Sequence, residues 1–244
     1  MQIDTGRDRP GTGRFGLISR LLLDALDSVR TSGRRPVLLD CGGGSGTYAV
    51  PLAVAGADVT VVDISADALA TLSRRAAEAG IASSVHPVQG DVEALGDLIG
   101  GAEFDLVLAH GILEAVDDVA AGFAGIRAAV RPGGLMSILV GNPVAAVVAR
   151  ALAGEPVLAL AELRELYTPE ARIGPDAVEA LCAGAGLVVE ARHGIGVFSD
   201  LVPGSALDAP GARDALDELD AAASGRSPFA EIAGRVHLLA RRPG

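Results

Sequence analysis

Residues 37–46 read VLLDCGGGSG, and this stretch decides the fold. An apolar run that ends in Asp40 and continues into glycines predicts a buried strand, a tight loop and the start of a helix. Glycine reaches positive φ easily and lets backbone approach a ligand, while the next helix offers free N–H groups at its start. The dinucleotide fingerprint would need Gly or Ala where this chain has Thr47. The stretch therefore predicts a ligand-binding loop, and NAD and FAD are disfavoured.

Short β-rich runs alternate with Ala- and Leu-rich stretches of helical periodicity along most of the chain. This alternation is typical of βαβ units and predicts an α/β fold with a mostly parallel sheet. The seven predicted strands are Val37–Asp40, Val59–Asp63, Val85–Gln89, Asp105–Ala109, Met136–Val140, Val188–His193 and Arg235–Ala240. The predicted helices between them are Leu17–Val29, Thr47–Ala55, Ala66–Ala79, Val92–Ile99, Asp118–Val130 and Pro175–Ala185.

Two stretches depart from simple alternation. Residues 142–173 contain VAAVVARALAG and LALAELREL, which predict a helical insertion after strand five and a candidate lid. Residues 205–224 predict a helix between the last two strands. Residues 1–16 are rich in Gly, Arg, Asp and Thr and predict a flexible segment. We expect residues 1–244 to form a single domain, because half of them are apolar and one core of that size is feasible.

Composition limits the partners and the compartment. The chain has 20 basic residues, all of them arginine, and 31 acidic residues, which gives a net charge of -11. DNA binding is disfavoured, because phosphate contacts need a clustered basic excess. Cys41 and Cys182 have neither a disulfide framework nor zinc-ligand spacing, so we expect no metal and a cytoplasmic protein. The apolar segment 143–153 is too short to span a bilayer and carries Arg150, so no membrane association is predicted.

The pattern Asp40-x-Gly42-x-Gly44-x-Gly46 resembles motif I of the class I S-adenosylmethionine-dependent methyltransferases. The resemblance implies a Rossmann-like sheet of seven strands with an antiparallel last strand, S-adenosylmethionine as cofactor and S-adenosylhomocysteine as product. It also implies that Asp63 binds the ribose hydroxyls, that Gly90-Asp91-Val92 form the adenine-binding turn, and that Ala109 and His110 line the sulfonium. The residues implied to bind the cofactor are Arg14, Asp40, Gly42, Gly43, Gly44, Ser45, Gly46, Asp63, Ile64, Gly90, Asp91, Val92, Ala109 and His110.

Further motifs resemble one branch of that family, the tRNA 5-carboxymethoxyuridine methyltransferases. They are HGILEAV after strand four, RPGGLMSILVGN around strand five, GIGVFSDL after strand six and VHLLARRP at the end of the chain. The branch methylates the carboxylate of a modified wobble uridine. Ahead of His237, however, it has an arginine and an aromatic residue facing the RNA, where this chain has Gly234 and Arg235. The departure puts the tRNA substrate in doubt, and so does the acidic composition.

The catalytic candidates are His110 and Asn142. A carboxylate acceptor needs no general base, whereas a neutral hydroxyl needs one, and the pKa of a histidine suits that role. The alternative for His110 is that it only lines the pocket. The amide of Asn142 could hold an acceptor group, or Asn142 could be a turn residue before Pro143. His193, Arg192 and Phe198 are candidates for the far wall of the acceptor site, while His86 and His237 are expected to be structural.

Three functions stay open from the sequence. The first is an O-methyltransferase acting on a carboxyl or hydroxyl group of a modified tRNA. The second is the same chemistry on a small molecule, which the net charge of -11 favours. The third is a non-catalytic module that binds the cofactor. The sequence predicts no oligomeric state.

Overall fold

The computed structural model describes residues 13–30, 34–168 and 173–244, and its centre is one seven-stranded sheet. The strand order is β3-β2-β1-β4-β5-β7-β6, in which β7 runs antiparallel to both of its neighbours and the other pairs are parallel. The predicted Rossmann-like α/β fold with an antiparallel last strand is confirmed. The strands are β1 (Val37–Cys41), β2 (Asp58–Asp63), β3 (Val85–Gln89), β4 (Phe104–His110), β5 (Val130–Gly141), β6 (Val188–Ile195) and β7 (Arg235–Arg241).

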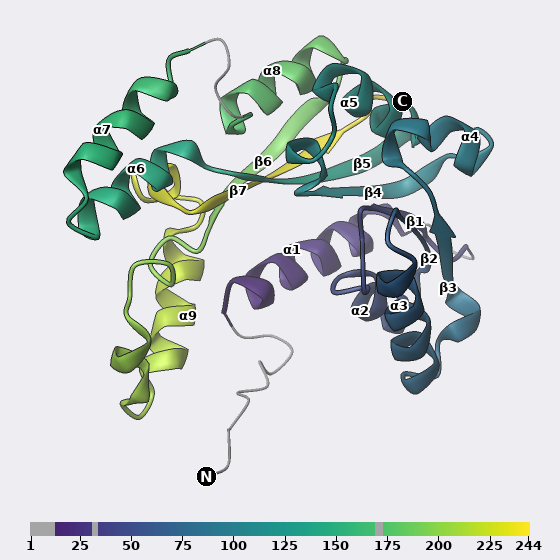
Figure 1. Cartoon of the computed structure of the whole chain (residues 1–244). Coiled ribbons are helices and arrows are strands. Elements are labelled where there is room, and N and C mark those ends of the chain that lie inside the picture. Colours follow the sequence, from purple (N-terminus) through teal and green to yellow (C-terminus); the bar gives the residue numbers. More distant parts are fainter. Residues whose placement is uncertain (1–12, 31–33, 169–172) are drawn as a thin grey trace.

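Helices cover both faces of the sheet (Figure 1). One face carries α1 (Gly13–Val29), α2 (Ala49–Val54) and α3 (Ala66–Glu78), and the other carries α4 (Leu95–Ile99), α5 (Val119–Ala128) and α8 (Pro175–Gly184). The predicted insertion after strand five is helical, with α6 (Pro143–Leu152) and α7 (Pro156–Glu165), and α9 (Ala212–Ala223) precedes β7 as expected. Short 3-10 turns complete the set: η1 (Ala82–Ser84), η2 (Val92–Ala94), η3 (Ile112–Glu114), η4 (Gly204–Asp208) and η5 (Phe229–Ile232).

Several boundaries differ from the prediction. Helix α1 begins at Gly13 rather than Leu17, so residues 13–16 of the segment predicted to be flexible are helical; residues 1–12 lie outside the described residues. The predicted helix Val92–Ile99 is divided into η2 and α4, because Asp91 caps a 3-10 turn through Glu93 N. Among the described residues, no helix is long and apolar enough to cross a bilayer. The single-domain assignment and the lid role of residues 142–173 stay predictions.

The core explains why the strands are apolar on both sides. Adjacent residues of β4, Leu106 and Val107, are both fully buried, one in the cluster against α1, α2 and α3 and the other in the cluster against α5 and α8. Because side chains alternate between the faces of a strand, a sheet covered on both sides needs continuous apolar runs. These runs fix the register, and the polar residues that follow each strand meet at the carboxyl edge.

At the other end of the parallel strands, where they begin, one buried carboxylate links three of them. Asp105, at the start of β4, is 1% exposed and accepts a hydrogen bond from Val37 N at 2.7 Å. It also pairs with Arg131 Nη1 at 2.5 Å and with Arg34. Both arginines keep part of their side chains in solvent, so the ion pairs satisfy a buried acid without burying two cations. Asp105 thereby ties β1, β4 and β5 together.

Replacing Asp105 with Ala should lower the free energy of unfolding by about 2 to 4 kcal/mol, because Val37 N and two guanidinium groups lose a buried partner. Urea unfolding measures the loss. The control is Asp58→Ala at the start of β2, since Asp58 pairs with Arg35 at 2.9 Å on the surface and should lose less than about 1 kcal/mol. Equal losses in both variants would contradict the anchoring role of Asp105.

Candidate active site

The loop after β1 has a backbone that only glycine accommodates easily. Gly42, Gly44 and Gly46 have φ of +71°, +53° and +78°, in the left-handed region that residues with a Cβ disfavour. A Cβ placed on Gly44 would meet no described atom closer than Asp63 Oδ2, at 3.7 Å. The outer side of Gly44 is therefore a cradle that a ligand can reach and a larger residue would fill.

Two loop glycines are required for packing on the inner side. A Cβ on Gly43 would lie 2.5 Å from the carboxyl group of Asp40, and one on Gly46 would lie 2.3 Å from Leu72 Cδ1. Contacts that short do not occur in real structures, so neither position accepts a side chain. The loop is consequently pressed onto β1 and α3, and only its outer side is accessible.

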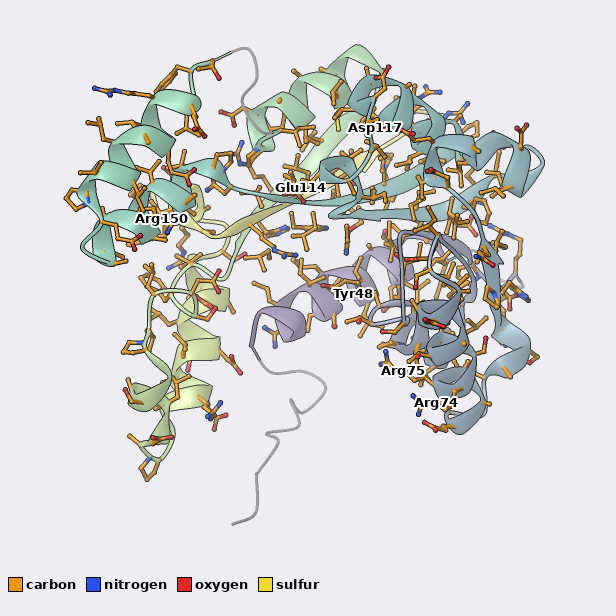
Figure 2. All side chains as sticks on the ribbon, in the orientation of Figure 1. Tyr48, Arg74, Arg75, Glu114, Asp117 and Arg150 are labelled. Atoms are coloured by element: carbon orange, nitrogen blue, oxygen red, sulfur yellow. The ribbon has the colours of Figure 1, made fainter. Side chains whose placement is uncertain are left out.

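The acid at the end of β2 holds the loop in place. Asp63 Oδ2 accepts a hydrogen bond from Gly44 N at 2.9 Å, and its Oδ1 accepts one from Ser65 N at 2.8 Å. From α3, Arg75 Nη1 donates to Ser45 O at 2.7 Å, and Figure 2 labels this arginine. Two carboxylate oxygens with spare lone pairs thus lie directly beside the cradle, where ribose hydroxyls were expected.

Asp40 lies beneath the loop as a buried acid with spare hydrogen-bonding capacity. It is 2% exposed, and among the described residues its Oδ2 has no hydrogen-bond partner. Burial raises the pKa of Asp40 to about 7, and the charge of Asp63 adds to the rise. A ligand that brings a donor or a cation would satisfy this oxygen. The pair of acids therefore fits the polar parts of S-adenosylmethionine, which carries both hydroxyl groups and positive charge.

Gly90, Asp91 and Val92, expected to bind adenine, form a turn directly after β3. Asp91 Oδ1 accepts from Glu93 N at 2.9 Å, and Gly90 N donates to Asp63 O at 3.1 Å, so the turn is tied to the end of β2. Val92, the last residue of the expected turn, is 4% exposed and belongs to the core. Ile64 is 71% exposed beside the turn. Ile64 is thus an exposed apolar side chain beside this turn, whereas Val92 is not.

His110 ends β4 at the same edge. Its Nε2 lies 2.8 Å from Ser137 Oγ. The imidazole ring of His110 meets the ring of Tyr48 edge-on, with the two ring centroids 4.9 Å apart; Tyr48 lies below the sheet in Figure 2. Among the described residues, the buried Nδ1 has no hydrogen-bond partner. Burial, and then the charge of Arg235, lower the pKa of His110 to about 3, so the imidazole is neutral at neutral pH. Ala109 is fully buried on the other face.

Asn142 does not have the free amide that an acceptor-binding role requires. Its Nδ2 donates to Glu231 O at 2.7 Å and to Ala233 O at 2.9 Å, and its Oδ1 accepts from Val144 N at 3.1 Å. Both donors are used, and the side chain caps α6 while clamping η5. The structure thus corrects the predicted catalytic role in favour of the alternative, a turn residue before Pro143.

The candidate wall residues divide between the two faces of the sheet. His193 lies on the same face as His110 and contacts His237, with their Nδ1 atoms 3.4 Å apart. Arg192 points to the other face, where it pairs with Asp176 at 3.0 Å and Glu179 at 2.8 Å on α8. Phe198 packs against Phe229, with ring centroids 5.9 Å apart. Only His193 is therefore brought toward His110.

Two further residues singled out in the sequence, Arg14 and His86, and one that was not, Ser137, remain to be placed. Arg14 lies in the first turn of α1, but its side chain is outside the part of the chain that the structure describes. His86 is exposed on the edge strand β3. Sequence reasoning missed Ser137, which is fully buried between His110 and His237. A lone hydroxyl in the apolar run LMSILV was the available signal.

A mostly apolar groove reaches the carboxyl end of β5. Its volume is about 1170 Å³, and it lies between α5 and α8 with Asn142 and Pro143 at one end. Arg192 is the basic residue among its described lining, and it is paired as above. The apolar part of the lining includes Val119, Phe123, Pro143, Val144, Ile173 and Leu181.

The sequence and the fold are similar to those of known methyltransferases. Residues 38–134 match a family described as a methyltransferase domain. The chain is 24% identical over 239 residues to the tRNA 5-carboxymethoxyuridine methyltransferase of Escherichia coli strain K12, covering 96% of this chain and 91% of that protein. It is 31% identical over 158 residues to a ubiquinone biosynthesis O-methyltransferase of Methylobacterium sp. strain 4-46, covering 65% and 62%. The structure of geranyl diphosphate C-methyltransferase from Streptomyces coelicolor A3(2), which contains S-adenosylhomocysteine, matches with a TM-score of 0.61 at 17% identity, covering 92% and 75%.

A shared fold does not by itself fix a reaction. Here, however, the family match over residues 38–134 contains the glycine loop, Asp63, Asp91 and His110, the same residues that the structure gathers at one edge. Residues 38–134 therefore form a methyltransferase domain that uses S-adenosylmethionine, and the chain resembles the class I S-adenosylmethionine-dependent methyltransferases.

Proposed function

We propose that this enzyme methylates an oxygen atom of a small, partly apolar metabolite. The observation that carries the proposal is the groove of about 1170 Å³ between α5 and α8, which is lined mainly by apolar side chains and has Asn142 and Pro143 at one end. We infer that the groove holds the apolar body of the acceptor, while its oxygen atom reaches over the carboxyl end of β5 toward His110. Small-molecule sites are typically concave and apolar with a few polar groups. We place the reaction in the cytoplasm, because both cysteines are free and buried.

Charge near this edge supports a small acceptor over a polyanion. Arg150 on α6 (Figure 2) pairs with Glu155 at 2.8 Å and Glu162 at 3.9 Å, and Arg192 pairs with two acids of its own. A guanidinium that is already neutralised releases little free energy on meeting a phosphate, because no net charge is compensated. Strong RNA binding would need other, unpaired cations.

We assign the cofactor site to the outer side of the glycine loop. S-adenosylmethionine supplies, when bound, a methyl group on a sulfonium that an oxygen nucleophile can displace. Asp63 would accept from the ribose hydroxyls, Ile64 would pack on the adenine, and Asp40 would meet a donor through its free oxygen. Because the leaving group is already activated, the chain mainly has to align the two reactants and exclude water.

Replacing Asp63 with Ala should weaken binding of S-adenosylmethionine and S-adenosylhomocysteine by about 1.5 to 3 kcal/mol, the usual loss for hydrogen bonds to a charged group. Isothermal titration calorimetry measures both affinities. Asp58→Ala, at the far end of the same strand, is the control and should bind normally.

Asp63 also holds Gly44 N and Ser65 N, so Asp63→Asn separates the two roles. This variant keeps an acceptor oxygen for only one of the two backbone amides, and it cannot accept from two hydroxyls as well. Weaker binding with an unchanged free energy of unfolding would assign the effect to the ligand. Affinity within twofold of wild type in both variants would refute the ribose contact.

Methylation of a modified tRNA is the second candidate. It is favoured by the similarity to a tRNA methyltransferase over 96% of this chain. Against it stand the paired arginines and the exchange of the branch's arginine and aromatic residue for Gly234 and Arg235. Nothing in the geometry of the loop distinguishes the two acceptors, since both share the cofactor.

The enzyme is given S-adenosylmethionine labelled on its methyl group, together with a panel of small acceptors and bulk tRNA. We expect the label to appear in a small product. The panel combines apolar rings and chains with hydroxyl or carboxyl groups. Ala120→Trp, which fills the groove from α5, should raise the KM for the acceptor by about tenfold, the effect of roughly 1.4 kcal/mol of lost binding. The affinity for S-adenosylhomocysteine should stay unchanged.

Ala77→Trp on the exposed side of α3 is the matched control and should alter neither constant. Label found only in tRNA would reject the metabolite and establish the second candidate. An unaffected KM in Ala120→Trp would show that the acceptor does not use the groove.

A further inference from the structure

Three histidines and one serine form a continuous row across four neighbouring strands. Ser137 Oγ lies 2.8 Å from both His110 Nε2 and His237 Nε2, and His237 Nδ1 lies 3.4 Å from His193 Nδ1. The register explains the alignment, since Leu139 pairs with both His110 and His237, and His237 pairs with His193. All four side chains share the face that α1 covers. We call His110, Ser137, His237 and His193 the histidine row.

The last link of the histidine row meets edge to edge. The rings of His193 and His237 are inclined by 21° with centroids 5.6 Å apart. The two Nδ1 atoms, at 3.4 Å, are closer together than the ring centres by roughly one ring width. The nitrogens therefore lie between the rings, where one proton can be shared.

The protons of the histidine row can be arranged in only two ways. Burial lowers the pKa of all three histidines, so each imidazole is neutral with a single N–H. The Ser137 hydroxyl has one proton and can donate to only one of its two neighbours, so the other must donate to it. Likewise, one proton serves the contact between His237 and His193. The position of the proton on His237 consequently fixes every other position in the row.

The two arrangements differ at the free end of the row. When His237 carries its proton on Nδ1, His110 donates from Nε2 and its Nδ1 is a bare acceptor. When His237 carries the proton on Nε2, the Ser137 hydroxyl points at His110, whose proton then sits on Nδ1. No described atom accepts from or donates to His110 Nδ1. One hop at each link converts the first arrangement into the second.

We propose that the histidine row is a proton wire that serves methylation of a hydroxyl acceptor, an inference that rests on the proposed O-methyltransferase function. A hydroxyl and a sulfonium give a methyl ether, a neutral thioether and one proton, whereas a carboxylate gives an ester and no proton. As the O–C bond forms and the C–S bond breaks, the hydroxyl proton moves to His110 Nδ1. The Nε2 proton of His110 passes to Ser137, the Ser137 proton to His237, and the Nδ1 proton of His237 to His193, which releases its Nε2 proton to solvent.

The relay removes the need for His110 to carry a positive charge. With a pKa of about 3, His110 cannot hold a proton as a buried imidazolium at neutral pH. Passing charge along the row moves it to His193, which is only half-buried and lies on the edge strand β6. After the product leaves, a proton that re-enters at His193 Nε2 drives the same hops in reverse, and the Nδ1 proton of His110 is released into the emptied acceptor site.

The first test reads the tautomers directly and needs no acceptor. Long-range ¹H–¹⁵N spectra of the protein labelled with ¹⁵N-histidine and saturated with S-adenosylhomocysteine give the protonated fraction of each ring nitrogen. The proposal requires equal fractions of Nδ1–H in His110, Nε2–H in His237 and Nδ1–H in His193. Ser137→Ala should break this equality, and Ser224→Ala should preserve it, because Ser224 is an equally buried serine whose Oγ has no partner among the described residues. Unequal fractions in the wild type would overturn the wire.

The second test uses the acceptor panel. Ser137→Ala should lower kcat for a hydroxyl acceptor by about 10²-fold, the smaller end of the range for general-base catalysis, without changing the KM for S-adenosylmethionine. Ser137→Thr retains the hydroxyl and should recover most of the activity. Turnover of carboxylates alone, or an unchanged kcat in Ser137→Ala, would overturn the proposal. Calorimetry with S-adenosylhomocysteine runs beside both tests: binding without coupled tautomers rejects only the wire, whereas absent binding rejects the proposed function.

Discussion

The contact between the glycine loop and the buried carboxyl group of Asp40 is the constraint on which the site depends. Gly43 has no room for a side chain because that carboxyl group lies beneath it, and Gly46 is closed off by Leu72. The loop must therefore turn outward at Gly44, where Asp63 holds it through a backbone amide. The opening beside Gly44 is a consequence of close packing everywhere else in the loop.

At the candidate site, the same packing leaves two of the five buried polar atoms that lack a hydrogen-bond partner among the described residues. Among the described residues, Asp40 Oδ2 and His110 Nδ1 are buried without hydrogen bonds. Asp40 pairs with Leu108, and His110 lies two residues farther along β4 on the same face, so both atoms belong to one edge of neighbouring strands. A buried polar group without a partner costs about 1 to 3 kcal/mol. These two atoms therefore lower the stability of the free protein, and a ligand that paired with them would restore it.

How much of this arrangement the sequence could predict depends on whether the signal is local. The loop, the acids that end β2 and begin η2, and the alternation of strands and helices were predictable, because turn chemistry and periodicity act over a few residues. Ser137 and His237 are 100 residues apart, and only the register of β5 against β7 brings them together. Asn142 could not be assigned either, because its partners Glu231 and Ala233 come from a distant 3-10 turn. The sequence did not distinguish Val92 from Ile64 for the same reason, since tertiary packing decides that Val92 is buried and Ile64 exposed.

The distribution of arginine links the fold to the choice of acceptor. Asp105 uses Arg34 and Arg131, Glu190 uses Arg241 at 2.5 Å, and the acids of α8 use Arg192. Guanidinium groups serve this purpose well, because they bind carboxylates in a fixed geometry and stay charged. These arginines are engaged in the fold, and a net charge of -11 would repel a polyanion overall, in line with the proposed small acceptor. A neutral hydroxyl acceptor avoids this repulsion altogether, and it is also the acceptor whose proton has to be removed. The electrostatics that disfavour a nucleic acid and the histidine row that can carry a proton therefore favour the same class of substrate for independent physical reasons.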